Sequence, residues 1–297
     1  MTWHGRDTIA LIDLIFFSPC LLLSVFVCFR HGFSKSSGWL YTLILCLVRI
    51  IGGICQFVSH SDQSAGLIQT ILILDSVGLA PLLLATLGLL SRFIDFVNAS
   101  SASRFTTRHF RLLHLVLLVA TILAIAGGTN ISVDSSGIYQ IPITSKVGVA
   151  LYISGFAGIV LMFLLSLAQI SVLPIKERRV PIAIGIALPF IAVRLLYSVL
   201  SVFLHNHLFS VANGSTAVRL GMAVIEEIVV VGIYVTLGLF VDKLNASTKG
   251  PISSRAKKGS KKQRAAPPAA IDPEAQYLNA YPTPSSPPYT QTHGVSR

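Results

Sequence analysis

Residues 39–60 of the chain, WLYTLILCLVRIIGGICQFVSH, form an apolar run that contains one strongly charged side chain, Arg49. A helix rises about 1.5 Å per residue, so a run of this length can cross the roughly 30 Å hydrocarbon core of a bilayer. A backbone in lipid must satisfy its own hydrogen bonds, and an α-helix does so. The run therefore predicts a transmembrane helix, with Arg49 near its middle making a polar contact inside the bundle.

One further run of this kind precedes residues 39–60 and five follow. The seven predicted spans are residues 9–29, 39–60, 67–91, 111–129, 147–173, 180–204 and 218–241. Pro81 and Pro189 fall within the third and sixth spans, where we expect them to kink the helices. The predicted fold class is all-α, a bundle of seven transmembrane helices.

The composition of the 297 residues excludes several other classes of protein. Hydrophobic residues make up 53% of the chain and charged residues 12%, against about 25% charged residues in ordinary globular domains. The mean hydropathy is +0.73. These values exclude a soluble enzyme, a disordered regulator and a disulfide-rich secreted domain. The four cysteines lack the spacing of metal ligands, so we predict no metal site and no cofactor.

Basic residues gather in the connections on one side of the predicted spans. The net charge is +11, and 18 Lys and Arg residues lie on that side against three, Arg6, Lys146 and Arg219, on the other. Cytoplasmic connections carry such an excess, so the N-terminus is predicted outside and the C-terminus in the cytoplasm. This arrangement requires an odd number of spans. Since membrane orientation accounts for the charge, we predict a multi-pass protein of the plasma membrane or an endomembrane, without a nucleic-acid partner.

Three segments follow from this topology: an outer N-terminus (1–8), the transmembrane domain (9–241) and a basic Pro/Ser/Ala-rich cytoplasmic tail (242–297). The tail has no apolar period and cannot bury a core, so it is predicted to be disordered. Its basic stretch, Lys249 to Arg264, predicts binding to anionic lipid headgroups of the bilayer. The alternative is that this stretch only flanks the last span.

Two Asn-x-Ser sequons lie on the predicted outer side, at Asn130 and Asn213. Both asparagines are candidate glycosylation sites, so the protein is predicted to be a glycoprotein. Asn98 and Asn245 head further sequons on the predicted inner side and should stay unmodified.

Six ionisable side chains fall inside the predicted spans, where such groups are costly and usually face the bundle interior. They are Asp13, Arg49, Asp75, Arg194, Glu226 and Glu227. Counting about 1.5 Å per residue from the span ends places all six between the middle of the membrane and its outer third. Two arginines and four carboxyl groups at similar depth predict one mutually paired polar cluster.

Residues three and four apart share a helix face, which identifies the neighbours of these groups. Gln56 follows Arg49 two turns later, and Tyr197 follows Arg194 by three residues. We favour Glu227 over Glu226 as the inward-facing member of its pair. The predicted ligand pocket comprises Asp13, Arg49, Gln56, Asp75, Arg194, Tyr197 and Glu227.

Two interpretations of the cluster stay open. It is either a salt-bridge network that sets helix packing, or a functional pocket built from the same residues. Carboxyl groups remain in surplus once the two arginines are paired, and such a group could donate a proton, bind a cationic ligand or relay protons. The candidate catalytic acids are Asp75, Glu226 and Glu227.

Two segments carry a resemblance to a known family. They are Arg49-Ile-Ile-Gly-Gly-Ile-Cys-Gln56 in the second span and Pro189-Phe-Ile-Ala-Val-Arg194-Leu-Leu-Tyr197-Ser in the sixth. The chain resembles an uncharacterised family of fungal seven-helix membrane proteins, a domain of unknown function, over about residues 5–245. The resemblance implies a fungal setting and a link to secondary metabolism, because some such genes lie near secondary-metabolite clusters. It implies no activity.

Three hypotheses for the function follow. The first is a receptor-like or accessory membrane protein, in which Arg49 and Arg194 pair with Asp75 and Glu227 and anchor a small lipophilic molecule. The second is a membrane-embedded terpene cyclase or isomerase with an acidic residue as general acid, by analogy with small seven-helix fungal cyclases. The third is a carrier of small molecules. Whether the protein is an enzyme stays open at this point.

Overall fold

The structure is a computed structural model that describes residues 5–31, 38–62, 64–100, 106–130, 132–133, 139–140, 142–170, 177–204 and 216–241. Seven helical segments within these residues are long and apolar enough to cross a membrane. This finding confirms the predicted seven-helix fold class. The predicted disordered tail, residues 242–297, lies outside the described residues, and the predicted orientation across the membrane stays a prediction.

The spans begin and end within six residues of the predicted positions, except that the third continues nine residues past its predicted end, to Ser100. The first two are α1 (Gly5–His31) and α2 (Trp39–Val58), and the third is divided between α3 (Ala65–Val77) and α4 (Leu79–Ser100). The next three are α5 (Thr107–Thr129), α6 (Ile143–Leu167) and α7 (Arg179–Phe203). The seventh consists of α8 (Thr216–Arg219), the π-helical segment η3 (Leu220–Val224) and α9 (Ile225–Phe240). In the connection after α5, two residues of β1 (Ser132–Val133) pair antiparallel with two of β2 (Tyr139–Gln140), which the sequence did not predict.

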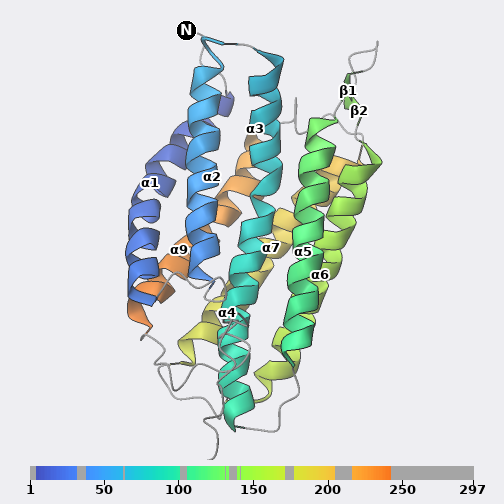
Figure 1. The fold of residues 1–297 in the computed structure, drawn as a ribbon. Coiled ribbons are helices and arrows are strands. Elements are labelled where there is room, and N and C mark those ends of the chain that lie inside the picture. Colours follow the sequence, from blue (N-terminus) through green and yellow to red (C-terminus); the bar gives the residue numbers. More distant parts are fainter. Residues whose placement is uncertain are drawn as a thin grey trace, which may run out of the picture. The chain divides into compact units, whose positions relative to one another are not determined.

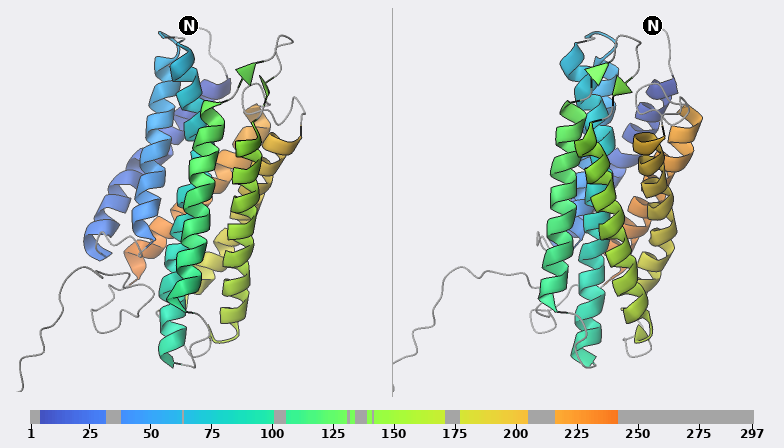
Figure 2. Two further views of the ribbon diagram at one scale, coloured as in Figure 1. Left: turned by 45° about the vertical axis from the view of Figure 1, so that its right-hand side comes forward. Right: turned by 90° about the vertical axis from the view of Figure 1, so that its right-hand side faces the viewer.

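The central helix of the bundle is α4, which contacts α2, α5, α6 and α7. Figures 1 and 2 show α1 beside α2 on one side of α3 and α4, and α5 beside α6 on the other. The third span is 72% buried within its most apolar stretch, the highest share among the seven. The hydroxyl groups of Thr86 and Tyr234 lie 2.7 Å apart and join α4 to α9 within this core.

The outward faces of the helices are apolar, as a lipid-facing surface requires. Leu22 and Phe29 on α1 are 72% and 71% exposed, and Ile122 on α5 is 64% exposed. In water such side chains would favour association or aggregation. The described surface therefore agrees with the membrane assignment made from composition.

The third span divides into α3 and α4 at Gly78, three residues before Pro81, although Gly78 keeps right-handed helical backbone angles (φ −54°, ψ −28°). Pro81 has no N–H to donate to the carbonyl group of Val77, and its ring crowds that carbonyl. A Cβ atom at position 78 would lie 2.6 Å from Nη2 of Arg49, so only glycine allows this approach. At Pro189, by contrast, α7 continues unbroken to Phe203.

The seventh span is irregular as well, because η3 lies directly before Glu226 and Glu227. A π turn is rare and is found mostly at functional sites. The interruptions of the third and seventh spans both border the same group of charged residues.

Candidate functional site

Glu227 on α9 is the centre of a buried group of charges, which we call the charge cluster. Its members are Arg49, Asp75, Arg194, Arg219 and Glu227. Arg49 donates to both carboxylate oxygens of Glu227, with 2.5 Å between Nη2 and Oε1. Arg194 donates from Nε to the same Oε1 over 2.7 Å. Glu227 is 0% exposed, so its burial is compensated by charge-assisted hydrogen bonds from two guanidinium groups.

Asp75 on α3 extends the charge cluster toward the seventh span. Its Oδ1 lies 3.4 Å from Nη1 of Arg49, and its Oδ2 contacts Nη2 of Arg219 on α8. The backbone carbonyl of Asp75 accepts a hydrogen bond from Nη2 of Arg194 over 3.1 Å. Asp75 lies in the last turn of α3, three residues before Gly78, so this hydrogen bond joins α7 to the point where α3 meets α4.

Arg194 is held on several sides by residues of its own helix, α7. Its Nη1 donates to Oγ of Ser198 over 3.0 Å. Its guanidinium carbon lies 5.6 Å from the centre of the Tyr197 ring, within range of a cation–π interaction. Tyr197 therefore supports the charge cluster through its contact with Arg194.

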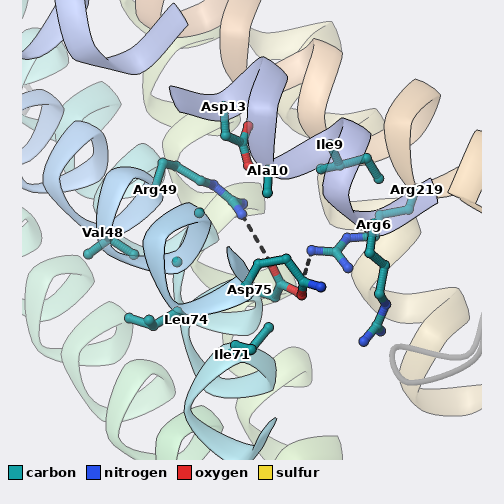
Figure 3. Close-up of a pocket in the computed structure, with 13 residues that line it drawn as sticks. Arg6, Ile9, Ala10, Asp13, Val48, Arg49, Ile71, Leu74, Asp75 and Arg219 are labelled. Atoms are coloured by element: carbon teal, nitrogen blue, oxygen red, sulfur yellow. Dashed lines mark hydrogen bonds and ion pairs between the residues drawn. The ribbon is translucent and has the colours of Figure 1, made fainter. Parts of the chain in front are cut away.

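A small cavity adjoins the charge cluster, and we call it the Asp13 pocket (Figure 3). It lies between α1, α2, α3 and α8, and its volume of about 20 Å³ is room for one water molecule. Its lining residues are Arg6, Ile9, Ala10, Asp13, Val48, Arg49, Gly52, Gly53, Gln56, Ile71, Leu74, Asp75 and Arg219. Asp13 is 5% exposed, and its Oδ1 has no hydrogen-bond partner among the described residues.

Asp7 anchors a second polar group near the beginning of α1. The side chain is 1% exposed, and its Oδ1 accepts a hydrogen bond from Nε2 of Gln56 over 3.2 Å. Nε2 of His60 lies 3.0 Å from the same oxygen. Sequence reasoning missed this group because residues 1–8 were assigned to the outer N-terminus, whereas α1 already begins at Gly5.

Arg219 was also missed, because it was counted among the basic residues of the outer connections. In a regular helix, seven residues place Arg219 on the face of Glu226. The π segment between them accommodates one extra residue, so Arg219 instead comes round to the side of Glu227 and the charge cluster. The seven-residue spacing indicates that Arg219 and Glu226 would share a face in a regular helix. The local composition does not predict the π segment that changes this.

The structure divides the predicted site residues into three sets. Asp13, Arg49, Gln56 and Asp75 line the Asp13 pocket, whereas Arg194, Tyr197 and Glu227 lie outside its wall. Glu226 takes no described part in the charge cluster. It is 9% exposed, and its buried Oε2 has no hydrogen-bond partner among the described residues. The expected single group of six is therefore four charged residues joined by Arg219, with Asp13 beside them and Glu226 apart.

A second charged pair lies at the other end of α4, where the sequence placed Arg92 in a cytoplasmic connection. In the structure Arg92 is a buried residue of α4 and not part of a connection, and the side of the membrane on which it lies stays a prediction. Its Nε and Nη2 donate to Oε2 and Oε1 of Glu177 over 3.2 and 2.7 Å. Arg92 comes 14 residues after Gly78, which is about 21 Å along a helix. Reassigning Arg92 and Arg219 removes one basic residue from each side of the predicted charge count.

The remaining predicted sites stand as follows. Asn130 is exposed at the end of α5, where its Nδ2 donates to the carbonyl of Ala126 over 2.7 Å. Asn213 lies outside the described residues. Within the part of the chain that the structure describes, no group of three or more His, Cys, Asp or Glu residues could hold a metal ion.

Comparison with known proteins assigns the chain to a family. A family model described as "Domain of unknown function (DUF7702)" matches residues 3–244, which include the seven spans. The chain therefore belongs to this family. No curated protein and no solved structure matches it.

Proposed function

We propose that this member of the DUF7702 family is a receptor-like membrane protein that binds a small molecule in the Asp13 pocket. The observation that carries the proposal is Oδ1 of Asp13, which is buried without a hydrogen-bond partner among the described residues, in a side chain that lines a polar cavity. Buried polar groups are almost always hydrogen-bonded, so such an exception calls for an occupant. With room for one water molecule, the pocket must widen when a larger ligand enters.

The wall of the Asp13 pocket offers a way to transmit binding. Arg49, Asp75 and Arg219 belong both to the wall and to the charge cluster. A ligand that contacts them competes for the same hydrogen bonds. It thereby acts on Arg194 of α7 and on the break between α3 and α4.

A second ion pair, away from the Asp13 pocket, joins α4 to the segment just before α7. Arg92 of α4 binds Glu177, which lies two residues before α7 begins at Arg179. A shift of α7 relative to α4 near the Asp13 pocket would strain this pair. We propose that loosening of the Arg92–Glu177 pair is the response that a partner on the opposite side of the membrane detects.

The charge cluster favours this function over a terpene cyclase or isomerase. A general acid must hold a proton before it can donate one. Glu227 and Asp75 are each engaged by two arginine side chains, and a proton on either carboxyl group would weaken these ion pairs. Glu226 is left as the candidate acid, and it does not line the Asp13 pocket. The proposal includes an accessory protein that binds the same kind of ligand in the Asp13 pocket and acts beside an enzyme.

A carrier is the second candidate, and one observation favours it. The third and seventh spans are both interrupted beside the charge cluster, and carriers often build their binding sites from interrupted helices near the middle of the membrane. A carrier redistributes its ligand across the membrane, whereas a receptor binds it without net movement. Flux into vesicles containing the full chain distinguishes the two.

The setting of the protein belongs to the same proposal. We place it in the plasma membrane or an endomembrane of a fungus, with a ligand connected to secondary metabolism. The basic stretch after the last span would bind anionic lipid headgroups, and Asn130 and Asn213 would carry glycans on the outer side. Loss of a mobility shift with glycosidase in the Asn130→Gln and Asn213→Gln variants tests the glycans and the orientation together.

Blocking the pocket tests the proposed function. The full chain in lipid nanodiscs is incubated with an extract of its source cells, and retained compounds are identified by mass spectrometry. Gly52 lines the pocket, so Gly52→Leu should abolish retention of a compound held by the wild type. Gly66 is the matched control, because a Cβ there meets no atom within 4 Å and Gly66 does not line the pocket. Equal retention by wild type, Gly52→Leu and Gly66→Leu would contradict the proposal.

A deletion strain separates binding from chemistry. Profiling of its metabolites, with re-expression of the wild type or of Glu226→Gln, should give the same compounds in both strains. An uncyclised or isomeric precursor that accumulates with Glu226→Gln alone would instead indicate an enzyme.

A further inference from the structure

We infer that the ligand of the Asp13 pocket presents a single negative charge, a carboxylate head group on an apolar body. The inference rests on the proposed function, because it names the class of ligand that the pocket takes. It departs from the simplest view of an unpartnered aspartate, which is that it binds a cationic amine.

The first argument is the balance of charge in the charge cluster. Three guanidinium groups, those of Arg49, Arg194 and Arg219, contact two carboxylates, those of Asp75 and Glu227. Each arginine contacts a carboxylate, but the three guanidinium groups carry one more charge than the two carboxylates. While Asp13 is a neutral acid, an ammonium group in the pocket would add a further cation beside these arginines, whereas an anion would offset the excess charge.

The second argument is the wall of the pocket itself. It contains three arginines, Arg6, Arg49 and Arg219, and two aspartates, Asp13 and Asp75. Arg219 has one described contact, to Asp75, although a guanidinium group carries five N–H donors in a fork that matches a carboxylate. Figure 3 shows Arg219 reaching Asp75 from one side and Arg49 reaching it from the other. The space beside Asp75 is therefore flanked by donors.

The third argument concerns Asp13, which no basic side chain contacts within the ion-pair distance in the described structure. As a neutral acid, Asp13 can donate a hydrogen bond to an incoming carboxylate. As an anion, it would repel that carboxylate. Replacement by asparagine keeps a donor and the shape of the side chain while removing the charge. Asp13→Asn should therefore bind an anionic ligand at least as tightly as the wild type, and it should lose a cationic ligand.

The rest of the wall suits an apolar body attached to the head group. Ile9, Val48, Ile71 and Leu74 complete the lining beside the arginines. The carboxylate could belong to an amphiphile that enters from the bilayer or to a small acid dissolved in water. Both share the chemistry that the arginines recognise.

The test uses the full chain in phosphatidylcholine nanodiscs and measures binding by calorimetry. The probes are dodecanoate, dodecylamine, dodecanol and acetate. Dodecanoate should bind, and its affinity should fall at least tenfold in Arg219→Gln and be retained in Arg219→Lys. Asp13→Asn should bind dodecanoate with equal or higher affinity. Binding of dodecanoate without acetate identifies an amphiphile as the ligand, and equal binding of both identifies a soluble acid.

Other outcomes overturn the inference and separate it from the proposed function. Binding of dodecylamine that disappears in Asp13→Asn would replace the anion by a cation and leave the proposed function standing. Binding of dodecanol alone would show that the pocket takes a neutral head group. It would overturn the carboxylate inference and would not contradict the proposed function. If none of the four probes binds wild type, the carboxylate inference fails. Loss of the retained compound in the Gly52→Leu experiment then decides separately whether the pocket binds anything.

Discussion

The charge cluster and the Asp13 pocket are neighbours built from some of the same residues, yet they satisfy their carboxyl groups in opposite ways. Glu227 is 0% exposed and engaged by Arg49 and Arg194. Asp13 is 5% exposed and has a carboxyl oxygen without a hydrogen-bond partner among the described residues. Arg49 belongs to both regions, because it binds Glu227 and also lines the pocket.

This difference suggests separate roles for the two regions, one in stabilising the fold and the other in binding a ligand. A buried charge held by several hydrogen bonds is costly to disturb, because removing one partner leaves the others buried without compensation. A buried polar group without a partner has no such network to lose. We therefore expect stability to depend on the charge cluster and ligand binding to depend on the Asp13 pocket.

Removing the central carboxylate should have the largest effect on stability. Glu227→Gln leaves the guanidinium groups of Arg49 and Arg194 buried with only an amide between them. We expect a loss of about 3–5 kcal/mol in the free energy of unfolding, measured by titrating the micellar protein with SDS. The control is Glu226→Gln, which should change stability by less than about 1 kcal/mol because Glu226 lies outside the cluster. Equal losses in the two variants would contradict the distinction between them.

Filling the space at the helix break should have the next largest effect. In Gly78→Ala, the new Cβ would lie 2.6 Å from Nη2 of Arg49 and 3.1 Å from Oε1 of Glu227. The Arg49–Glu227 pair must move, so we expect a loss of about 1–3 kcal/mol, as for other overpacked sites. Gly52→Ala is the control, since its Cβ meets Leu74 at an ordinary 3.8 Å. The same SDS titration applies, and a neutral Gly78→Ala would show that the cluster does not pack tightly against the break.

The Arg92–Glu177 pair offers a comparison at the other end of α4. Its side chains are 5% and 12% exposed, so the pair is less enclosed than Glu227. Arg92→Gln and Glu177→Gln should each cost about 1 kcal/mol or somewhat more. The double variant should cost less than the sum of the two, because both remove the same interaction. Strict additivity in this cycle would mean that the two side chains do not interact in the folded protein.

Changing Asp13 should have the smallest effect on stability. Asp13→Asn preserves the shape of the side chain and removes a charge that has no described ion-pair partner. We expect a change within about 0.5 kcal/mol or a small gain, followed in the same titration. A loss comparable to that of Glu227→Gln would show that Asp13 belongs to the charge cluster in solution.

The sequence was sufficient to predict the spans because apolar length alone identifies them. It also predicted that Arg49, Asp75, Arg194 and Glu227 lie together, since charged side chains inside a membrane usually face the bundle interior and pair with one another. A separate observation favoured Glu227 over Glu226, and in the structure Glu227 occupies the centre of the cluster. The preference came from the small and aromatic residues that share the face of Glu227.

The remaining features depend on backbone irregularities that composition does not encode. Pro81 predicted a kink, whereas the close approach of Arg49 to Gly78 could not be predicted from residue types. The π segment brings Arg219 toward Asp75, and no residue type predicts a π turn. Arg92 was misplaced because the span was ended too early, and a charge at a helix end looks the same in sequence whether it is solvated or paired.

The central claim is that the Asp13 pocket, unlike the core around it, is open to a ligand from the side of the N-terminus. The direct measurement is cysteine labelling with a membrane-impermeant thiol reagent in sealed vesicles whose outer surface carries the N-terminal side of the protein. The background lacks the natural cysteines Cys20, Cys28, Cys46 and Cys55. Gly52→Cys places a thiol in the pocket wall, and Leu45→Cys places one in the core of the same helix, where Leu45 is 1% exposed. The account predicts that only the thiol at position 52 reacts with reagent added outside. A silent position 52, or one that reacts only after the membrane is permeabilised, would contradict it.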